Sequence, residues 1–373
     1  MTSFSRSIQS LTLSLQEERK VLVRIGYQCL AALPNELESL KVGKKLVVIT
    51  QEALSSLYAA SLQSILEEAG FQVSVILLPD GESAKNLSHV SRALDQIFEL
   101  KLERNDTVIA MGGGVVGDCA GFIASIYLRG INLVHLPSTL LACVDSSIGG
   151  KTGVNHEKGK NLIGSFYQAR LVFMDLALLR SLPKREWLCG LAEVVKYGVI
   201  SNTTLFSLLE TRLEDLITFD LDSHVDLYRT IISESASDKL NVVAADEKES
   251  GQRAFLNFGH TIGHAIEAVF GYGDYLHGEA VAIGMYAAML LAEKMGRVSQ
   301  AETDRLKNLL VRLGFGLRLR PVSTEKLIET LAMDKKVQAG KIRFVLPSAL
   351  GHVEIVDTVD LMLVRDVLDT IKK

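Results

Sequence analysis

The chain is poor in cysteine, proline and tryptophan, with four, six and one of these among its 373 residues. The cysteines are far apart and form no Cys-x-x-Cys pair, so neither a disulfide framework nor a cysteine zinc site is predicted. They are Cys29, Cys119, Cys143 and Cys189. We expect reduced thiols that pack in the interior of a cytoplasmic protein.

Long apolar runs and blocks of one charge are also missing. The longest apolar stretches, near residues 131–144 and 280–292, are shorter than the roughly 18–20 residues that a spanning helix needs. Residues 1–16 lack the apolar core of a signal peptide. The 40 basic and 44 acidic residues give a formal charge of −4, without the basic block that engages nucleic acid. We expect no membrane and no nucleic acid as partner.

Length and periodicity indicate two domains, because 373 residues exceed what one hydrophobic core usually holds. Over residues 1–181, β-rich runs alternate with helical patterns, which predicts a parallel α/β domain. Residues 182–373 follow the helical period and predict a mostly α-helical domain. Strands are expected at 45–50, 71–77, 106–111, 131–136, 171–175 and 342–346, with an antiparallel edge pair within 11–24. Helices are expected at 185–199, 205–213, 225–243, 260–270, 279–295, 301–313 and from 360.

A glycine-rich turn follows the strand expected at 106–111. Residues 112–118 read Gly-Gly-Gly-Val-Val-Gly-Asp and contain G-x-G-x-x-G, whose glycines let backbone N–H groups approach a pyrophosphate at a helix N-terminus. The turn departs from the Rossmann fingerprint because no acidic residue stands about 20 positions later. A turn that only packs a helix on the sheet is the alternative. Asp80 and Glu82 follow the preceding strand and favour dinucleotide binding at this edge.

Residues 145–161 form a second polar segment, rich in glycine, lysine and asparagine. We expect an anion-binding loop here, rather than a strand or a helix. Gly150-Lys151-Thr152 match the end of a Walker A loop, but Asp145 stands where that motif needs glycine. ATP chemistry is therefore not favoured.

Three of the eight histidines, His260, His264 and His277, lie within 18 residues. The first two are spaced i, i+4 and share one helix face. A catalytic zinc takes three protein ligands, and the third is either another histidine or a carboxylate. Glu193 is a candidate because it stands in an apolar helical stretch, where burial needs a metal or a base as partner.

Six motifs in this order resemble the 3-dehydroquinate synthase family of the sugar phosphate cyclase superfamily. They are Gly-Gly-Gly-Val-Val-Gly-Asp, Asp-Ser-Ser-x-Gly-Gly-Lys-Thr, Gly-Lys-Asn, Glu-Val-Val-Lys-Tyr-Gly, Asn-Phe-Gly-His-x-x-Gly-His and Leu-His-Gly-Glu, and the resemblance covers about residues 80–346. It implies a nucleotide-binding α/β domain followed by an α-helical metal domain. It also implies conversion of DAHP to 3-dehydroquinate and phosphate, in the shikimate pathway of aromatic amino acid biosynthesis. The family's route is transient oxidation by NAD, phosphate elimination, reduction and intramolecular aldol closure, in a homodimer with zinc or cobalt.

The resemblance also implies roles for individual residues, with the metal held by Glu193, His260 and His277 rather than by the histidine pair. The residues implied for NAD are Asp80, Gly81, Glu82, Ser83, Ala84, Lys85, Gly114, Val115, Val116, Gly117, Asp118, Ser138, Thr139, Lys151, Lys160, Leu178, Leu179, Arg180 and Ser181. Those implied for substrate and catalysis are Asp145, Lys151, Asn161, Lys196, Lys239, Glu249, Arg253, Asn257 and His264, with Arg129 reaching across from a neighbouring subunit. Lys335 is a further candidate for substrate.

Three other functions stay open at this point. A metal-dependent glycerol or alcohol dehydrogenase would share the two-domain plan, but it has no need for the anion-binding lysines and arginines. A sister cyclase would make an inosose or a valiolone from another sugar phosphate. A scaffold that has lost catalysis is the third alternative, and the retention of every matched metal and substrate residue argues against it.

Overall fold

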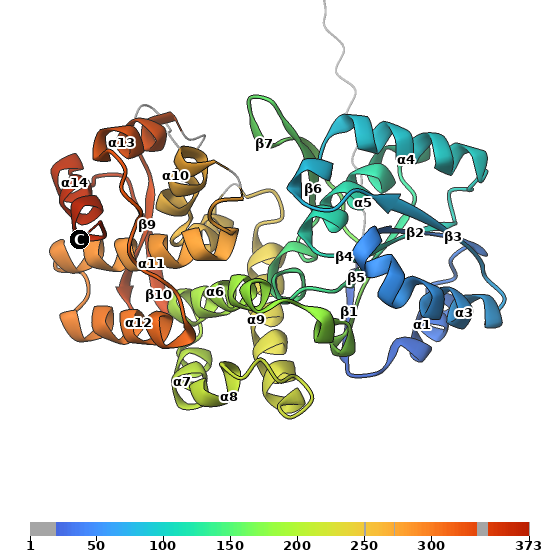
Figure 1. Ribbon diagram of the computed structural model, residues 1–373, viewed down its shortest axis with the longest axis horizontal. Coiled ribbons are helices and arrows are strands. Elements are labelled where there is room, and N and C mark those ends of the chain that lie inside the picture. The colour runs from blue at the N-terminus through green and yellow to red at the C-terminus, as the bar shows by residue number, and fades with distance from the viewer. Residues whose placement is uncertain (1–19, 250, 272, 334–341, 373) are drawn as a thin grey trace, which may run out of the picture.

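The computed structural model describes residues 20–249, 251–271, 273–333 and 342–372. The N-terminal half is built around a six-stranded, all-parallel sheet in the order β1-β8-β5-β4-β2-β3. This sheet is drawn on the right of Figure 1. The strands are β1 (Leu22–Gly26), β2 (Lys45–Gln51), β3 (Gln72–Leu78), β4 (Thr107–Gly112), β5 (Asn132–Pro137) and β8 (Leu171–Asp175). The five strands expected between residues 45 and 175 are confirmed.

The expected antiparallel edge pair is wrong for the described part of the segment. β1 lies at the edge but runs parallel to β8, with Leu22 opposite Leu171 and Gly26 opposite Asp175. The carboxylate of Asp175 accepts hydrogen bonds of 2.8 Å from the backbone N–H groups of Cys29 and Leu30. These bonds hold the chain where it leaves β1. They join residues far apart in the chain, so no local sequence pattern predicts them. Residues 11–19 lie outside the described part.

The two faces of the sheet carry separate cores because side chains alternate along each strand. On one face, Val47 and Val108 pack with α4 (Leu87–Glu99) and α5 (Gly114–Ile126). On the other face, Leu46 and Ile109 pack with α1 (Leu33–Ser39) and α3 (Ala60–Glu68). The first core continues into the helices that follow the sheet. The polar loops after β3, β4, β5 and β8 all leave the carboxyl edge, where open parallel sheets bind ligands.

The chain after residue 183 is mostly helical, as expected, and it lies on the left of Figure 1. Sequence analysis missed α13 and the second strand of a hairpin, β9–β10, whose first strand lies at the expected position. The helices are α6 (Lys184–Ile200), α7 (Thr203–Thr211), α8 (Leu213–Leu216), α9 (Val225–Ala245), α10 (His260–Phe270), α11 (His277–Lys294), α12 (Gln300–Leu313), α13 (Thr324–Met333) and α14 (Leu361–Thr370), and the strands are β9 (Phe344–Ala349) and β10 (His352–Val356). Within the described ranges, every helix is too short or too polar to cross a bilayer.

The larger part of the glycine- and lysine-rich segment, residues 151–161, is not a loop, and this expectation was wrong there. It folds into an antiparallel hairpin of β6 (Lys151–His156) and β7 (Gly159–Phe166), which projects between the two halves of the chain in Figure 1. Gly153 and Gly164 face each other across the ladder, and a Cβ on Gly164 would lie 2.1 Å from the carbonyl oxygen of Thr152. The glycines that suggested a loop thus allow close backbone approach inside a hairpin.

Candidate active site

Glycines let three helices approach closely around the histidine cluster. Gly259 precedes α10 in the left-handed region, with φ of +76°. A Cβ on Gly263 would lie 3.2 Å from the carbonyl oxygen of Ala280 in α11, and one on Gly278 would lie 2.5 Å from the backbone of Cys189 in α6. α6, α10 and α11 therefore pack backbone to backbone, which brings their polar residues to one point.

Glu193 of α6, His260 of α10 and His277 of α11 meet at that point. One ligand atom from each lies within 4.8 Å of the others. Glu193 Oε1 is 3.5 Å from Nε2 of both histidines, and its side chain is fully buried. Two imidazoles and a carboxylate are a ligand set of catalytic zinc. The histidine spacing left the third ligand open, and the structure offers the carboxylate of Glu193 for it.

The remaining ring nitrogens are held by outer partners. His260 Nδ1 lies 3.0 Å from the carbonyl oxygen of Phe258, and His277 Nδ1 lies 3.2 Å from Glu267 Oε2. Partners of this kind fix the tautomer that leaves Nε2 free to bind a metal. The residues therefore fit a zinc or cobalt ion in both donor type and orientation.

The electrostatics of the cluster favour a charged carboxylate. Burial opposes ionisation of Glu193, but Lys196 and His260 lower the pKa of this carboxyl group to about 2. Burial alone would lower the pKa of His277, whereas its hydrogen bonds with Glu193 and Glu267 raise that pKa to about 10. A proton on His277 thus balances the Glu193 carboxylate, and a bound divalent cation would replace that proton.

Lys196 joins the metal cluster to a second buried group. Its Nζ forms an ion pair with Glu193 and lies 3.9 Å from Asp145 Oδ1. The same Asp145 oxygen accepts hydrogen bonds from Lys239 Nζ at 2.7 Å and from the hydroxyl of Tyr197 at 3.0 Å. Burial favours neutral Asp145, but Lys239 and Lys196 lower its pKa below the ordinary range. Lys239 and Lys196 thus stabilise the Asp145 carboxylate, although burial lowers the pKa of Lys239 itself.

A third group gathers residues expected to bind substrate. Lys151, at the start of β6, forms an ion pair with Glu249, whose Oε1 accepts a 3.0 Å hydrogen bond from Asn257. Arg253 is only 1% exposed and donates a 2.9 Å hydrogen bond to the carbonyl oxygen of Gly149. Its Nε has no hydrogen-bond partner among the described residues, so the guanidinium retains a free donor.

Not every residue expected at the substrate site joins these groups. The ring centroid of His264 lies 5.4 Å from that of His260 and 6.0 Å from that of His277, so it borders the metal cluster. Asn161 is exposed on β7. Arg129 is exposed in the turn after α5 and has no hydrogen bond or ion pair within the described part of the chain. Lys335 lies outside the described residues.

The glycine-rich turn lies where β4 runs into α5, which begins at Gly114. Gly112 is also needed for packing, since a Cβ there would lie 2.6 Å from Val116. Ser138 and Thr139 follow the neighbouring strand β5, and the buried hydroxyl of Ser138 has no partner among the described residues. The dinucleotide and packing interpretations of this turn are therefore compatible.

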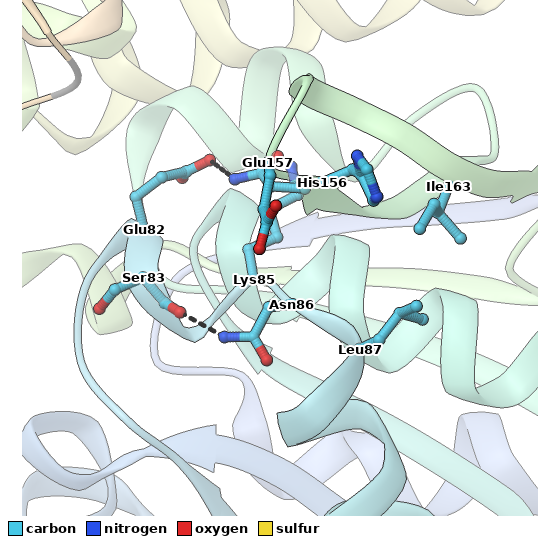
Figure 2. Close-up of a pocket in the computed structure, with 9 residues that line it drawn as sticks. Glu82, Ser83, Lys85, Asn86, Leu87, His156, Glu157 and Ile163 are labelled. Atoms are coloured by element: carbon cyan, nitrogen blue, oxygen red, sulfur yellow. Dashed lines mark hydrogen bonds between the residues drawn. The ribbon is translucent and has the colours of Figure 1, made fainter.

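The loop after β3 lies beside this turn and borders a cavity of about 420 Å³. Figure 2 shows its wall, to which Glu82 and Lys85 contribute. Asn155 Nδ2 of the β6–β7 hairpin donates a 2.8 Å hydrogen bond to Glu82 Oε1. Lys85, almost fully buried, forms an ion pair with Asp118 of α5. Burial raises the pKa of Asp118 and Lys85 opposes that rise. Asp80 is exposed at the mouth of the loop.

Three residues expected to contact NAD also have partners within the protein. Lys160 Nζ lies 3.1 Å from Glu267 Oε1, next to the metal cluster. Arg180 Nε donates to Asp222 Oδ1 at 2.9 Å, and the Ser181 hydroxyl accepts a 3.0 Å hydrogen bond from Tyr58. Leu178 and Leu179, which precede Arg180, are buried.

Tyr197 and Glu267 are site residues that sequence analysis missed. Tyr197 directly follows Lys196 in the motif Glu-Val-Val-Lys-Tyr-Gly. Its hydroxyl was not considered as a hydrogen-bond donor because the surrounding helix is apolar. Glu267 stands seven residues after His260 and three after His264, a spacing that places all three on one helix face. Extending the histidine pattern by one turn would have found it.

Residues 75–189 match the family described as 3-dehydroquinate synthase N-terminal, and residues 190–337 match 3-dehydroquinate synthase C-terminal. The chain belongs to the 3-dehydroquinate synthase family. A 3-dehydroquinate synthase of Synechocystis sp. is 47% identical over 88% of this chain and 91% of its own length.

Two solved structures of cyclases share the fold of this family member. The 2-epi-5-epi-valiolone synthase of Streptomyces hygroscopicus subsp. jinggangensis, with NAD⁺ and Zn²⁺ bound, superposes with a TM-score of 0.88 at 26% identity, over 97% of this chain and 99% of its own. A 2-deoxy-scyllo-inosose synthase complexed with carbaglucose-6-phosphate, NAD⁺ and Co²⁺ gives 0.78 at 25% identity, over 93% and 95%. The expected fold, an α/β nucleotide-binding part followed by a helical metal-binding part, is that of these cyclases.

Proposed function

We propose that this protein is an NAD- and divalent-metal-dependent 3-dehydroquinate synthase, which converts DAHP to 3-dehydroquinate and phosphate in the shikimate pathway. The observation that carries the proposal is the position of Lys196, between the metal-ligand cluster at Glu193 and the cationic group around Asp145. A dehydrogenase of neutral polyols needs only the first cluster. An enzyme for an anionic sugar phosphate needs both.

Within this proposal, bound NAD would supply a transient oxidation of a substrate alcohol, and zinc or cobalt held by Glu193, His260 and His277 would polarise the oxygen of that alcohol. Lys151, Arg253 and His264 hold the anionic groups of the substrate, since cationic donors bind carboxylate and phosphate through charge-assisted hydrogen bonds. Lys196 and Lys239 lie beside Asp145, whose carboxylate they stabilise. The site thus orients the phosphate for elimination and leaves proton removal to a group on the substrate.

The proposal also covers assembly and organisation. We propose a cytoplasmic homodimer in which Arg129, exposed and unengaged within the described part of one chain, completes the site of the other copy. The four cysteines are unpaired, which agrees with a reducing compartment. We further propose a boundary between domains at residues 181 and 182, just before α6 begins at Lys184.

The test is an assay of purified protein with DAHP, catalytic NAD and zinc, in which inorganic phosphate is followed and the carbocycle is identified by mass and NMR. We expect phosphate and 3-dehydroquinate in equal amounts without net NADH, and no reaction with a chelator. Net NADH from glycerol or another polyol would replace the proposal by a dehydrogenase. Release of phosphate only from other sugar phosphates would indicate a sister cyclase, and absence of all reactions with metal-loaded protein would indicate a scaffold.

A further inference from the structure

The two carboxylate oxygens of Glu267 contact two different parts of the fold. Oε2 lies 3.2 Å from Nδ1 of His277, which opens α11, and Oε1 lies 3.1 Å from Nζ of Lys160 on β7. The Glu267 side chain, on α10, is 6% exposed. Burial would raise its pKa, yet His277 and Lys160 lower that pKa to about 2. A buried carboxylate thus bridges a metal-ligand candidate and the hairpin.

The β6–β7 hairpin in turn contacts the loop after β3. From β6, the backbone N–H of Asn155 donates to the carbonyl oxygen of Lys85 at 2.8 Å, and its side-chain amide donates to Glu82 at 2.8 Å. Glu82 and Lys85 line the cavity shown in Figure 2. One continuous path of polar contacts therefore joins the metal cluster, Glu267, the β6–β7 hairpin and the cavity wall.

We propose that Glu267 is a positioning residue that orients His277 for the metal and docks the β6–β7 hairpin through Lys160, so that metal binding and hairpin docking are coupled. This inference rests on the metal site of the proposed function. A carboxylate that accepts the Nδ1 proton of an imidazole fixes the tautomer and raises the basicity of Nε2. In this structure that Nε2 faces Glu193. The second oxygen then ties the same residue to the hairpin.

The geometry places Glu267 outside the first ring of ligands. His264, Glu267 and His277 also fall within 4.8 Å of one another, so direct ligation by Glu267 is the competing hypothesis. However, Glu267 lies on the Nδ1 side of His277 and Glu193 lies on the Nε2 side. A metal held by Glu193, His260 and Nε2 of His277 would leave Glu267 across the ring.

The test compares four variants: Glu267→Ala, Glu267→Gln, Lys160→Met and, as matched control, Lys158→Met. Lys158 is exposed at the turn of the same hairpin, so its substitution removes the same charge without touching Glu267. Zinc affinity is measured by competition with a chromophoric chelator, and hydrogen exchange of residues 151–166 is measured with and without zinc. The absorption spectrum of the Co²⁺-loaded proteins reports the ligand set. None of these readouts needs substrate, so failure of the inference is distinguishable from failure of the proposed activity.

In the wild type and in Lys158→Met, we expect zinc to slow exchange in the hairpin. Glu267→Ala should weaken zinc binding by about 10- to 100-fold and abolish this protection. Glu267→Gln keeps an acceptor for Nδ1 and should recover part of the affinity, while Lys160→Met should lose the protection with a smaller loss of affinity. If Glu267→Ala does not fold, Glu267→Gln and Lys160→Met still decide the question.

Three results would overturn the inference. Wild-type zinc affinity in both Glu267 variants would show that the residue does not orient His277. Unchanged zinc protection of the hairpin in Lys160→Met would remove the coupling. A Co²⁺ spectrum in Glu267→Gln that reports a changed coordination number would make Glu267 a ligand instead of a positioning residue.

Discussion

Gly284 of α11 lies against Gly259 at the start of α10, so closely that a Cβ at position 284 would be 2.0 Å from the carbonyl oxygen of Gly259. His260 directly follows Gly259, and His277 opens the helix that carries Gly284. The distance between these two imidazoles, 5.2 Å between ring centroids, therefore depends on a backbone contact that only glycine permits.

Gly284→Ala should destabilise the protein and separate the metal ligands, because the obstacle is backbone and not a flexible side chain. Overpacking of this kind typically costs about 1–3 kcal/mol. Urea unfolding measures the free energy of unfolding, and chelator competition measures zinc affinity. Gly316→Ala is the control, since nothing lies within 4 Å of a Cβ there. Equal stability of the two variants would contradict the packing argument.

Glu193→Gln keeps the size of the side chain but removes its charge. Zinc binding should weaken by at least about 100-fold, since outer partners alone contribute up to that factor, and turnover should be lost with the metal. Metal content after dialysis and the phosphate-release assay check both effects. Full activity with bound zinc would refute the assignment of Glu193 as a ligand.

His264→Asn separates a substrate contact from a metal ligand. Its ring borders the cluster, whereas Glu193 lies between His260 and His277. We therefore expect near-normal zinc content together with strongly reduced turnover, measured on the same preparation. Loss of zinc equal to that of Glu193→Gln would make His264 a ligand.

Arg129→Ala tests the homodimer. The variant should be inactive but folded, because this side chain is exposed. Mixing it with an inactive Glu193→Gln protein should restore part of the activity, since one site of the mixed dimer combines an intact Arg129 with an intact Glu193. Absence of rescue, with mixed dimers demonstrated by mass, would place Arg129 outside the neighbouring site.

His135 on β5 is buried, and burial lowers its pKa to about 4. The unfolded chain takes up this proton below pH 6.5, whereas the folded protein does so only near pH 4, so stability falls as the pH drops through this window. Between pH 7 and pH 5 the wild type should lose about 2 kcal/mol more than His135→Leu does. Urea unfolding at both pH values measures this difference. The exposed His352→Leu should behave like the wild type, and an unchanged pH dependence in His135→Leu would contradict the assignment.

The strands between residues 45 and 175 could be predicted because buried parallel strands read as short apolar runs between glycine-rich or polar turns. The same rule failed for residues 151–166, where glycines serve close approach within a hairpin. It also failed for the orientation of β1, which Asp175 helps to hold through Cys29 and Leu30. In both cases the deciding contact joins residues that a local window does not pair.

The sequence by itself determined the family, the parallel sheet and the candidates Glu193, His260 and His277, because ordered motifs and periodicity are local properties. Only the tertiary structure decided that Lys196 connects Glu193 with Asp145, that Tyr197 belongs to the site, and that Glu267 contacts both His277 and Lys160. These contacts join helices and a hairpin far apart in the chain. Their distances follow from how closely glycines let α6, α10 and α11 pack, which spacing along the sequence does not contain.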